Sequence, residues 1–113
     1  MTFHVRVSPR AQEDIERNAQ WWADNHSIEQ AVRWFAAVRK QLKSLTTFPE
    51  SHGLSPENDD FPYEIRDKVV GLGSRPGYRA VFTIVEDTVH VLTIRSGSED
   101  RLRADEIPAV ANE

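Results

Sequence analysis

The chain has 113 residues, 39% of them hydrophobic, and carries three Trp, five Phe and two Tyr. These amounts predict one domain over residues 1–113 with a single packed core, and they exclude a disordered chain. Cysteine is absent, which excludes disulfides and thiolate metal sites. The net charge of −4 argues against a protein that holds nucleic acid mainly by charge. Because the sequence has no signal pattern and no window of about 20 apolar residues, we expect a soluble, cytoplasmic protein.

The N-terminal segment, residues 2–7, alternates apolar and polar side chains, which is typical of a short strand with one buried face. Ser8 and Pro9 then predict the start of a helix. The serine hydroxyl can cap the first turn, and proline is tolerated at the first helical position. Apolar residues at helical spacing continue this helix to about Asp24.

A second helix is predicted to follow almost at once. Ser27 and Gln30 have the spacing of a capping box, and Phe48-Pro49 ends the helical pattern. Its apolar stripe consists of Ile28, Ala31, Phe35, Val38, Leu42 and Leu45. Two helices with so short a connection are expected to pack antiparallel, as a hairpin.

The second half of the chain reads as a polar loop followed by strands. Residues 50–62 predict a surface loop, and the acidic run around Asp59 is interpreted as solvated. Strands are predicted over residues 63–72, 77–85 and 88–96, with a last helical turn around Leu102 and Ile107. The fold class is therefore α+β: an N-terminal strand and an antiparallel helical hairpin packed on one face of an antiparallel β-meander.

Metal and phosphate motifs are not found. The histidines, His4, His26, His52 and His90, have none of the spacings typical of metal ligands, so we expect neither a metal nor a cofactor. The glycines between residues 71 and 77 match neither a dinucleotide-binding loop nor a P-loop, and they predict a hairpin turn instead.

Arg79 and Arg95 stand at the outer ends of two apolar runs that flank Glu86-Asp87. A two-residue turn would place the two arginines on opposite faces of the sheet, whereas a longer or bulged hairpin would place them on one face. The bulged register is preferred because it gives the helices a continuous apolar layer. That layer is Tyr78, Ala80, Phe82, Ile84, His90, Leu92 and Ile94, and the arginine face then carries Val81, Val85, Val89 and Val91.

In this register the arginines collect on the uncovered face of the sheet, together with Arg66 and with Arg75 at its rim. The candidate target-binding residues are Arg66, Arg75, Tyr78, Arg79 and Arg95. On the residues alone the structural interpretation is preferred: arginines on an open sheet face pair with Asp67, Glu64 or solvent.

The tryptophans are a second set of candidates. Trp22 is predicted to belong to the interface between the helices, whereas Trp21 and Trp34 lie beside the apolar stripes. An exposed tryptophan at either position could anchor a partner protein. The preferred interpretation is that both lie at the edge of the core.

The order of elements and several local sequences resemble the RelE/ParE superfamily of bacterial toxins from type II toxin–antitoxin pairs. The most specific segments are GYRAVF at residues 77–82 and VHVLTI at residues 89–94, and the resemblance covers nearly the whole chain. It implies a small toxin in a hetero-oligomer with an antitoxin, whose helix and extended segment wrap it. Members of the superfamily either cut messenger RNA in the ribosome or poison DNA gyrase.

The resemblance implies that a ribonuclease of this kind would use Arg79 to stabilise the charged transition state. Such enzymes also use basic residues after the last strand and a late aromatic or histidine. This chain has Glu99 and Asp100 there, and no Tyr, His, Phe or Trp follows Asp100. Gyrase inhibition needs only a binding surface and is therefore preferred. The alternatives are a ribosome-dependent mRNA endoribonuclease and a non-toxic module that binds partners through the toxin fold.

Overall fold

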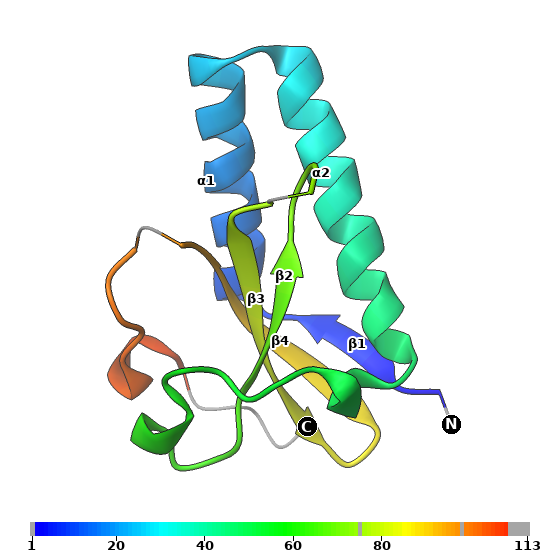
Figure 1. Cartoon of the computed structure of the whole chain (residues 1–113), viewed down its shortest axis with the longest axis vertical. Helices are drawn as coiled ribbons and strands as arrows, with labels where there is room; N and C mark the ends of the chain where they lie inside the picture. Colours follow the sequence, from blue (N-terminus) through cyan, green and yellow to red (C-terminus); the bar gives the residue numbers. More distant parts are fainter. Residues whose placement is uncertain (1, 75, 98, 109–113) are drawn as a thin grey trace.

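The computed structural model describes residues 2–74, 76–97 and 99–108. Two antiparallel helices pack against one face of a four-stranded sheet (Figure 1). The helices are α1 (Pro9–Asn25) and α2 (Ile28–Lys43), and the strands are β1 (His4–Val7), β2 (Arg66–Val70), β3 (Tyr78–Val85) and β4 (Thr88–Ser96). The strand order is β1-β4-β3-β2, with β1 parallel to β4 and the other pairs antiparallel. The predicted α+β class is confirmed.

Both helices begin at the predicted serine caps. The hydroxyl of Ser8 accepts a hydrogen bond from the amide of Ala11 at 3.0 Å, and Ser27 accepts one from Gln30 at 3.0 Å. The Ser8 hydroxyl also donates to the carbonyl of Leu92 at 3.1 Å. The first turn of α1 is therefore fixed to β4, which ties the helical half of the chain to the sheet.

The buried face of α2 differs from the predicted stripe at Ile28, Trp34 and Phe35. Trp34 is fully buried and its ring lies 5.1 Å from that of Tyr78, whereas Phe35 is only half-buried. Ile28, predicted to be in the stripe, is 75% exposed. The indole buries more apolar area than the other side chains, so the helix is rotated toward it. The other buried positions are Ala31, Val38 and Leu42, followed by Leu45.

The hairpin of β3 and β4 is bulged, so the prediction that Arg79 and Arg95 share a face is confirmed. Arg79 pairs with Arg95 and Val81 with Thr93, but Phe82 pairs with Val91, which leaves Leu92 as the extra residue. The bulge lies in the middle of β4 and not at the turn. The half of β4 that is nearer the turn therefore keeps the register of a two-residue turn.

Four residues of β4 are therefore on the opposite face from the one predicted. Val89 and Val91 pack in the core beneath the helices, and not beside the arginines. Leu92 packs on the arginine side, and His90 pairs with Thr83, whose hydroxyl donates to the carbonyl of Glu64. A bulge changes which face a residue lies on only for the residues beyond it. The sequence pattern could not show where along β4 the bulge lies.

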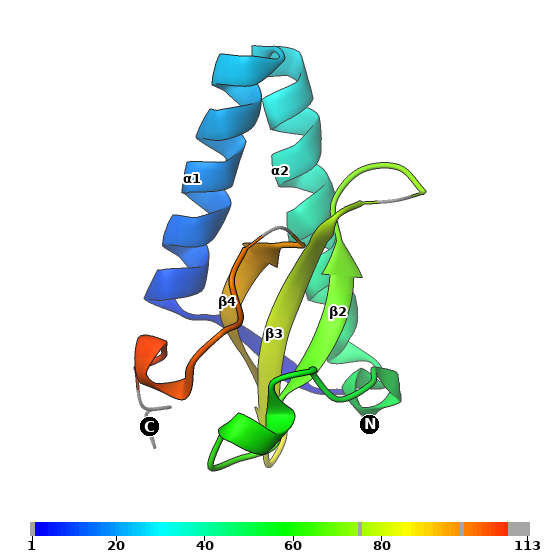
Figure 2. The same cartoon turned by 60° about the vertical axis from the view of Figure 1, so that its left-hand side comes forward.

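The face of the sheet that was predicted to be uncovered carries a second apolar cluster. It consists of Phe61, Ile65, Val81, Leu92, Leu102 and Ile107. Residues 52–64 and the tail, residues 99–108, supply its outer members and lie beside the strands (Figure 2). Residues 50–62 are thus not simply a surface loop, because Ser55, Glu57 and Phe61 are buried.

The strand predicted over residues 63–72 is shorter than expected. The amide of Ile65 donates to the Asn58 side chain at 2.8 Å, and its carbonyl accepts from Ser55 at 2.9 Å. The backbone groups of Ile65 are therefore hydrogen-bonded to the loop and not to the sheet. At the other end Gly71 has a φ of 124°, which turns the chain away from the strand direction.

Candidate functional site

Arg79 lies at the centre of a partly buried cluster of charged groups beneath residues 52–64. Its guanidinium donates to both carboxylate oxygens of Glu57, with 2.9 Å between Nη1 and Oε1. Nη1 also donates to Asp67 at 3.0 Å and to the Ser55 hydroxyl at 3.1 Å. β3 supplies the arginine, β2 supplies Asp67, and the loop supplies the other two residues. The planar fork of Arg79 is therefore engaged by two carboxylates at once.

The electrostatics of this cluster favour its charged form. Burial opposes the ionisation of Glu57, but hydrogen bonds from Arg79, the Leu102 amide and Ser55 outweigh burial and lower its pKa to about 2. Burial likewise opposes the charge on Arg79, but Glu57 and Asp67 raise the pKa of the guanidinium above its ordinary value. Because Glu57 also accepts from the amide of Leu102 at 3.0 Å, the cluster joins loop and tail.

Arg95 holds the tail in a similar way. Its side chain is 8% exposed, donates to the carbonyl of Asp100 and lies 3.4 Å from a carboxylate oxygen of Glu106. Glu106 also pairs with Arg10 of α1, whose guanidinium donates to the Glu106 carbonyl. The Nε of Arg95 is buried without a hydrogen-bond partner. Arg95 thus connects β4, the tail and the first turn of α1.

The other predicted target-binding residues are arranged differently. Arg66 pairs with Phe82 in the sheet, so it lies on the opposite face from Arg79, and the prediction that they share a face is wrong. Its guanidinium contacts Glu64 at 2.9 Å and donates to the carbonyl of His52. Tyr78 is half-buried against Trp34, and Arg75 lies outside the described residues.

The structural interpretation of the arginines holds for two predicted pairs. Arg79 pairs with Asp67, and Arg66 pairs with Glu64. Sequence reasoning missed Glu57, the residue with the most contacts to Arg79, because it stands in an acidic run that was interpreted as solvated. Only Asp59 and Asp60 of that run are exposed. The run lies between Pro56 and Pro62 and close to apolar residues, which was the available signal that part of it could be buried. This signal does not distinguish Glu57 from its neighbours.

The two candidate tryptophans have opposite environments. Trp21 is 48% exposed and makes an edge contact with Trp22, at 5.4 Å between ring centroids. Trp34 is fully buried, so the core interpretation holds for it and it offers no exposed anchor. Trp22, predicted at the interface between the helices, is half-buried and packs against the core cluster beneath them. Of the two candidates, only Trp21 is accessible to a partner in this conformation.

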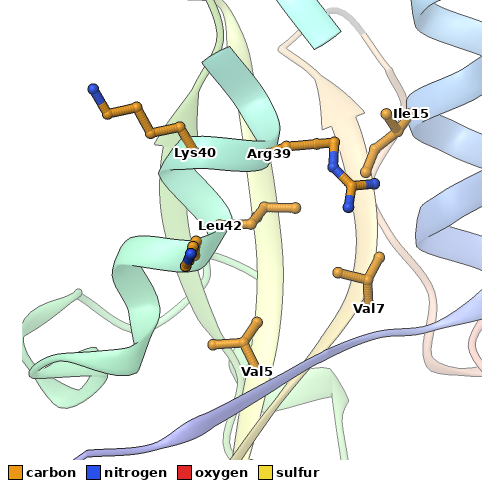
Figure 3. Close-up of a pocket in the computed structure, with 7 residues that line it drawn as sticks. Val5, Val7, Ile15, Arg39, Lys40 and Leu42 are labelled. Atoms are coloured by element: carbon orange, nitrogen blue, oxygen red, sulfur yellow. The ribbon is translucent and has the colours of Figure 1, made fainter. Parts of the chain in front are cut away.

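A separate hollow lies between α1, α2 and β1 (Figure 3). Its volume is about 400 Å³. The lining is apolar at Val5, Val7, Ile15 and Leu42 and cationic at Arg39, Lys40 and Lys43. The Arg39 guanidinium lies on the side of Ile15, whereas the Lys40 side chain extends away from the apolar residues (Figure 3). Sequence reasoning missed this hollow, because it depends on how β1 packs beside the helices.

Within residues 2–74, 76–97 and 99–108, no group of three or more His, Asp or Glu side chains is placed to hold a metal ion. In the same part of the chain, neither helix is both long and apolar enough to cross a bilayer.

The helical hairpin on a four-stranded sheet is a fold that solved structures from toxin–antitoxin systems share. A chain of the chromosomal ParDE toxin–antitoxin system from P. aeruginosa has a TM-score of 0.69 and 16% identity, over 84% of this chain and 96% of that one. The E. coli toxin RelE, an arginine-to-alanine double mutant in the free state, has a TM-score of 0.53 and 17% identity, over 87% and 86%.

The family follows from the sequence itself. Residues 5–101 match the family model of the ParE toxin of type II toxin–antitoxin systems, parDE. The chain therefore belongs to the ParE toxin family. No curated protein matches it in sequence.

Proposed function

We propose that this chain is the toxin of a toxin–antitoxin pair, that it inhibits DNA gyrase in the cytoplasm, and that a cognate antitoxin neutralises it. Membership of the ParE toxin family supports the toxin and its partner. The environment of Arg79 supports gyrase, rather than the ribosome, as the target. Its guanidinium is bound by Glu57 and Asp67, so this cluster carries one more negative charge than positive charges.

A phosphate of RNA would have to displace a carboxylate from Arg79 and then sit beside both acidic side chains. Like charges at contact distance in a partly buried site repel strongly. The carboxylates thus remove the arginine's capacity to stabilise a phosphorane-like transition state. The tail, which contains no Tyr, His, Phe or Trp after Asp100, supplies no aromatic or histidine acid–base partner either.

The proposal assigns two kinds of role to the candidate arginines. Arg79 and Arg95 act on a target through the loop and the tail that they hold in position. Contacts of Arg66, Arg75 and Tyr78 with a target stay predictions. Trp21, the exposed tryptophan of the helical hairpin, stays a predicted contact for the antitoxin.

The experiment is induction of the chain without antitoxin, with DNA and protein synthesis followed separately by pulse-labelling. We expect DNA synthesis to stop first, and purified chain to inhibit supercoiling by gyrase. If protein synthesis stops first and the purified chain promotes ribosome-dependent mRNA cleavage that Arg79→Lys abolishes, the chain is a ribonuclease. If growth continues with folded protein present, the chain is a non-toxic partner-binding module.

A further inference from the structure

The carboxylate of Glu106 lies among three arginine side chains from separate parts of the fold. Its Oε2 is 3.4 Å from Nη1 of Arg95 in β4 and 3.8 Å from Nη2 of Arg10 in α1. Its Oε1 is 3.8 Å from Nη2 of Arg103 in the tail. Residues 104–106 lie beside the start of α1, which brings the three guanidinium groups together (Figure 2). We call these four residues the tail cluster.

The ion pairs of the tail cluster are long. Charge-assisted hydrogen bonds between a guanidinium and a carboxylate usually span about 2.7–2.9 Å. Arg66–Glu64 and Arg101–Asp60 have such distances, 2.9 and 2.8 Å, although both carboxylates are more exposed than that of Glu106. Glu106 approaches none of its three arginines as closely, because one carboxylate cannot fit all of them at once.

The hydrogen-bond donors of Arg95 are poorly used. Its side chain is 8% exposed, yet among the described residues its Nε has no hydrogen-bond partner. Nη2 donates to the carbonyl of Asp100, and Nη1 faces Glu106 at 3.4 Å. A buried donor without a close acceptor is costly. Arg95 would therefore gain from an acceptor with more oxygen atoms than a carboxylate offers.

The charges at this place favour a dianion. Four arginines and three carboxylates form one connected set of ion pairs, so positive charges exceed negative ones by one. If a dianion takes the place of the Glu106 carboxylate, the charges balance, whereas a monoanion only repeats the charge already there. The members of the set are Asp14, Asp105 and Glu106 with Arg10, Arg17, Arg95 and Arg103.

This place can open without unfolding the tail. The side chains of Arg10 and Glu106 are 31% and 23% exposed, so their contact lies at the surface. Rotation about the side-chain bonds of Glu106 moves its carboxylate into solvent. The backbone can stay where it is, because Arg10 donates to the carbonyl of Glu106 and Ile107 is buried in the second apolar cluster.

We infer that Arg10, Arg95 and Arg103 bind a dianionic phosphate group, either inorganic phosphate or the monoester of a nucleotide, where the Glu106 carboxylate now lies. A phosphate monoester offers three acceptor oxygens and a charge of about −2 above its second pKa of about 6. The planar fork of arginine suits such an acceptor. A phosphodiester carries a single negative charge and has no such advantage over the carboxylate. The inference goes beyond the proposed function and does not rest on it.

The test is calorimetric titration of the purified chain with inorganic phosphate, sulfate, a nucleoside 5′-monophosphate and a dinucleotide whose one phosphate is a diester. Near neutral pH we expect the monophosphate to bind at least about tenfold more tightly than the diester. Its affinity should rise about tenfold from about pH 5 to about pH 7.5, because the dianion fraction rises by that factor. Sulfate is a dianion throughout and should change less than about twofold, which controls for titration of the protein. Tighter binding of the monophosphate than of inorganic phosphate would assign the site to a nucleotide, and equal binding would assign it to free phosphate.

Two pairs of matched variants locate the binding. Glu106→Gln removes the competing carboxylate and should tighten the monophosphate about tenfold, a gain that misfolding cannot produce. Glu64→Gln removes an exposed carboxylate that is paired with Arg66, and should change the affinity less than about twofold.

Arg10→Gln should weaken the monophosphate about tenfold, whereas Arg101→Gln, which removes an exposed and paired arginine, should change it less than about twofold. Circular dichroism verifies that both arginine variants are folded. In nuclear magnetic resonance spectra of the unchanged chain, the monophosphate should shift the Nε–H signals of Arg10 and Arg95.

Four results would overturn the inference. They are no saturable binding of either phosphate, a diester that binds as tightly as the monoester, parallel pH profiles for monophosphate and sulfate, and equal effects of Glu106→Gln and Glu64→Gln. Because the readouts are affinity and chemical shift, they are independent of growth arrest and of gyrase inhibition.

Discussion

Arg79 and Arg95 lie directly opposite each other on β3 and β4, yet their guanidinium groups hold different segments. Arg79 binds the loop through Glu57, and Arg95 binds the tail through Asp100 and Glu106. The amide of Leu102 joins the two systems, because it donates to the same carboxylate that accepts from Arg79. A pair of arginines on one sheet face therefore fixes both segments that cover it.

Glu57 should make the stability of the protein depend on acid pH. Its pKa is about 2 in the folded chain against an ordinary value of 4.5. A lowered carboxyl pKa stabilises the fold fully above about pH 4.5 and loses this contribution as pH falls toward 2. The shift corresponds to about 3 kcal/mol. Glu57→Gln should therefore lower the unfolding free energy by about 2–3 kcal/mol near neutral pH and by far less near pH 2.

Denaturant unfolding at a series of pH values measures this difference. Asp59→Asn, an exposed residue of the same acidic run, is the control and should leave the acid side of the profile unchanged. A loss for Glu57→Gln that is equal at neutral and acid pH would contradict the role of its ionised form.

Arg79 and Glu57 should be energetically coupled. Arg79→Met leaves the buried Glu57 and the partly buried Asp67 near each other without a counter-charge, which should cost about 3 kcal/mol. The double variant Arg79→Met with Glu57→Gln should lose about 1–3 kcal/mol less than the sum of the single changes. A double-mutant cycle by chemical denaturation measures this coupling. The exposed pair Arg101–Asp60 is the comparison, for which we expect less than about 1 kcal/mol.

The two candidate tryptophans should respond oppositely to substitution. Trp34→Ala removes a fully buried ring and should cost about 3–5 kcal/mol. Trp21→Ala removes a ring that is 48% exposed and should cost less than about 1 kcal/mol. Thermal unfolding of the two variants checks this. Acrylamide should quench the fluorescence contributed by Trp21 and spare that of Trp34, and equal quenching would contradict the environments described.

Leu92 and Ile94 should report on the two faces of the sheet separately. Both are buried on β4, but Leu92 packs with the loop and tail, whereas Ile94 packs beneath the helices. Alanine at either position should cost about 2–5 kcal/mol. Hydrogen exchange should accelerate first in residues 55–64 and 99–107 for Leu92→Ala, and first in the helices for Ile94→Ala. Loss of protection in the same region for both variants would mean that the two clusters open together.

The helical half of the chain was predictable because its signals are local. The serine caps at Ser8 and Ser27 depend on residues within one helical turn, and the structure confirms both. The exposure of Ile28 shows the limit of such signals. Periodicity identifies an apolar stripe, but whether Trp34 or Phe35 points into the core depends on the sheet beneath it.

The covered face of the sheet was not predictable for a different reason. The position of the bulge at Leu92 reverses the facing of every residue on one side of it, and nothing local to Leu92 marks it. Glu57 illustrates the same limit for the candidate site. Its burial requires β2, β3 and the tail together, and in the sequence these lie 10, 22 and 45 residues away at Asp67, Arg79 and Leu102.

The parallel pairing of β1 with β4 has a consequence for the timing of synthesis. His4–Val7 pair with residues 88–91, so β1 must wait for a segment that is made much later. Contacts between such distant parts of a chain form late in folding. A nascent or truncated chain that ends before Thr88 lacks all of β4, which is the neighbour of β1 in the sheet. It therefore has neither a complete sheet nor Arg95. The finished fold, and any toxicity that depends on it, can therefore arise only after β4 has been translated.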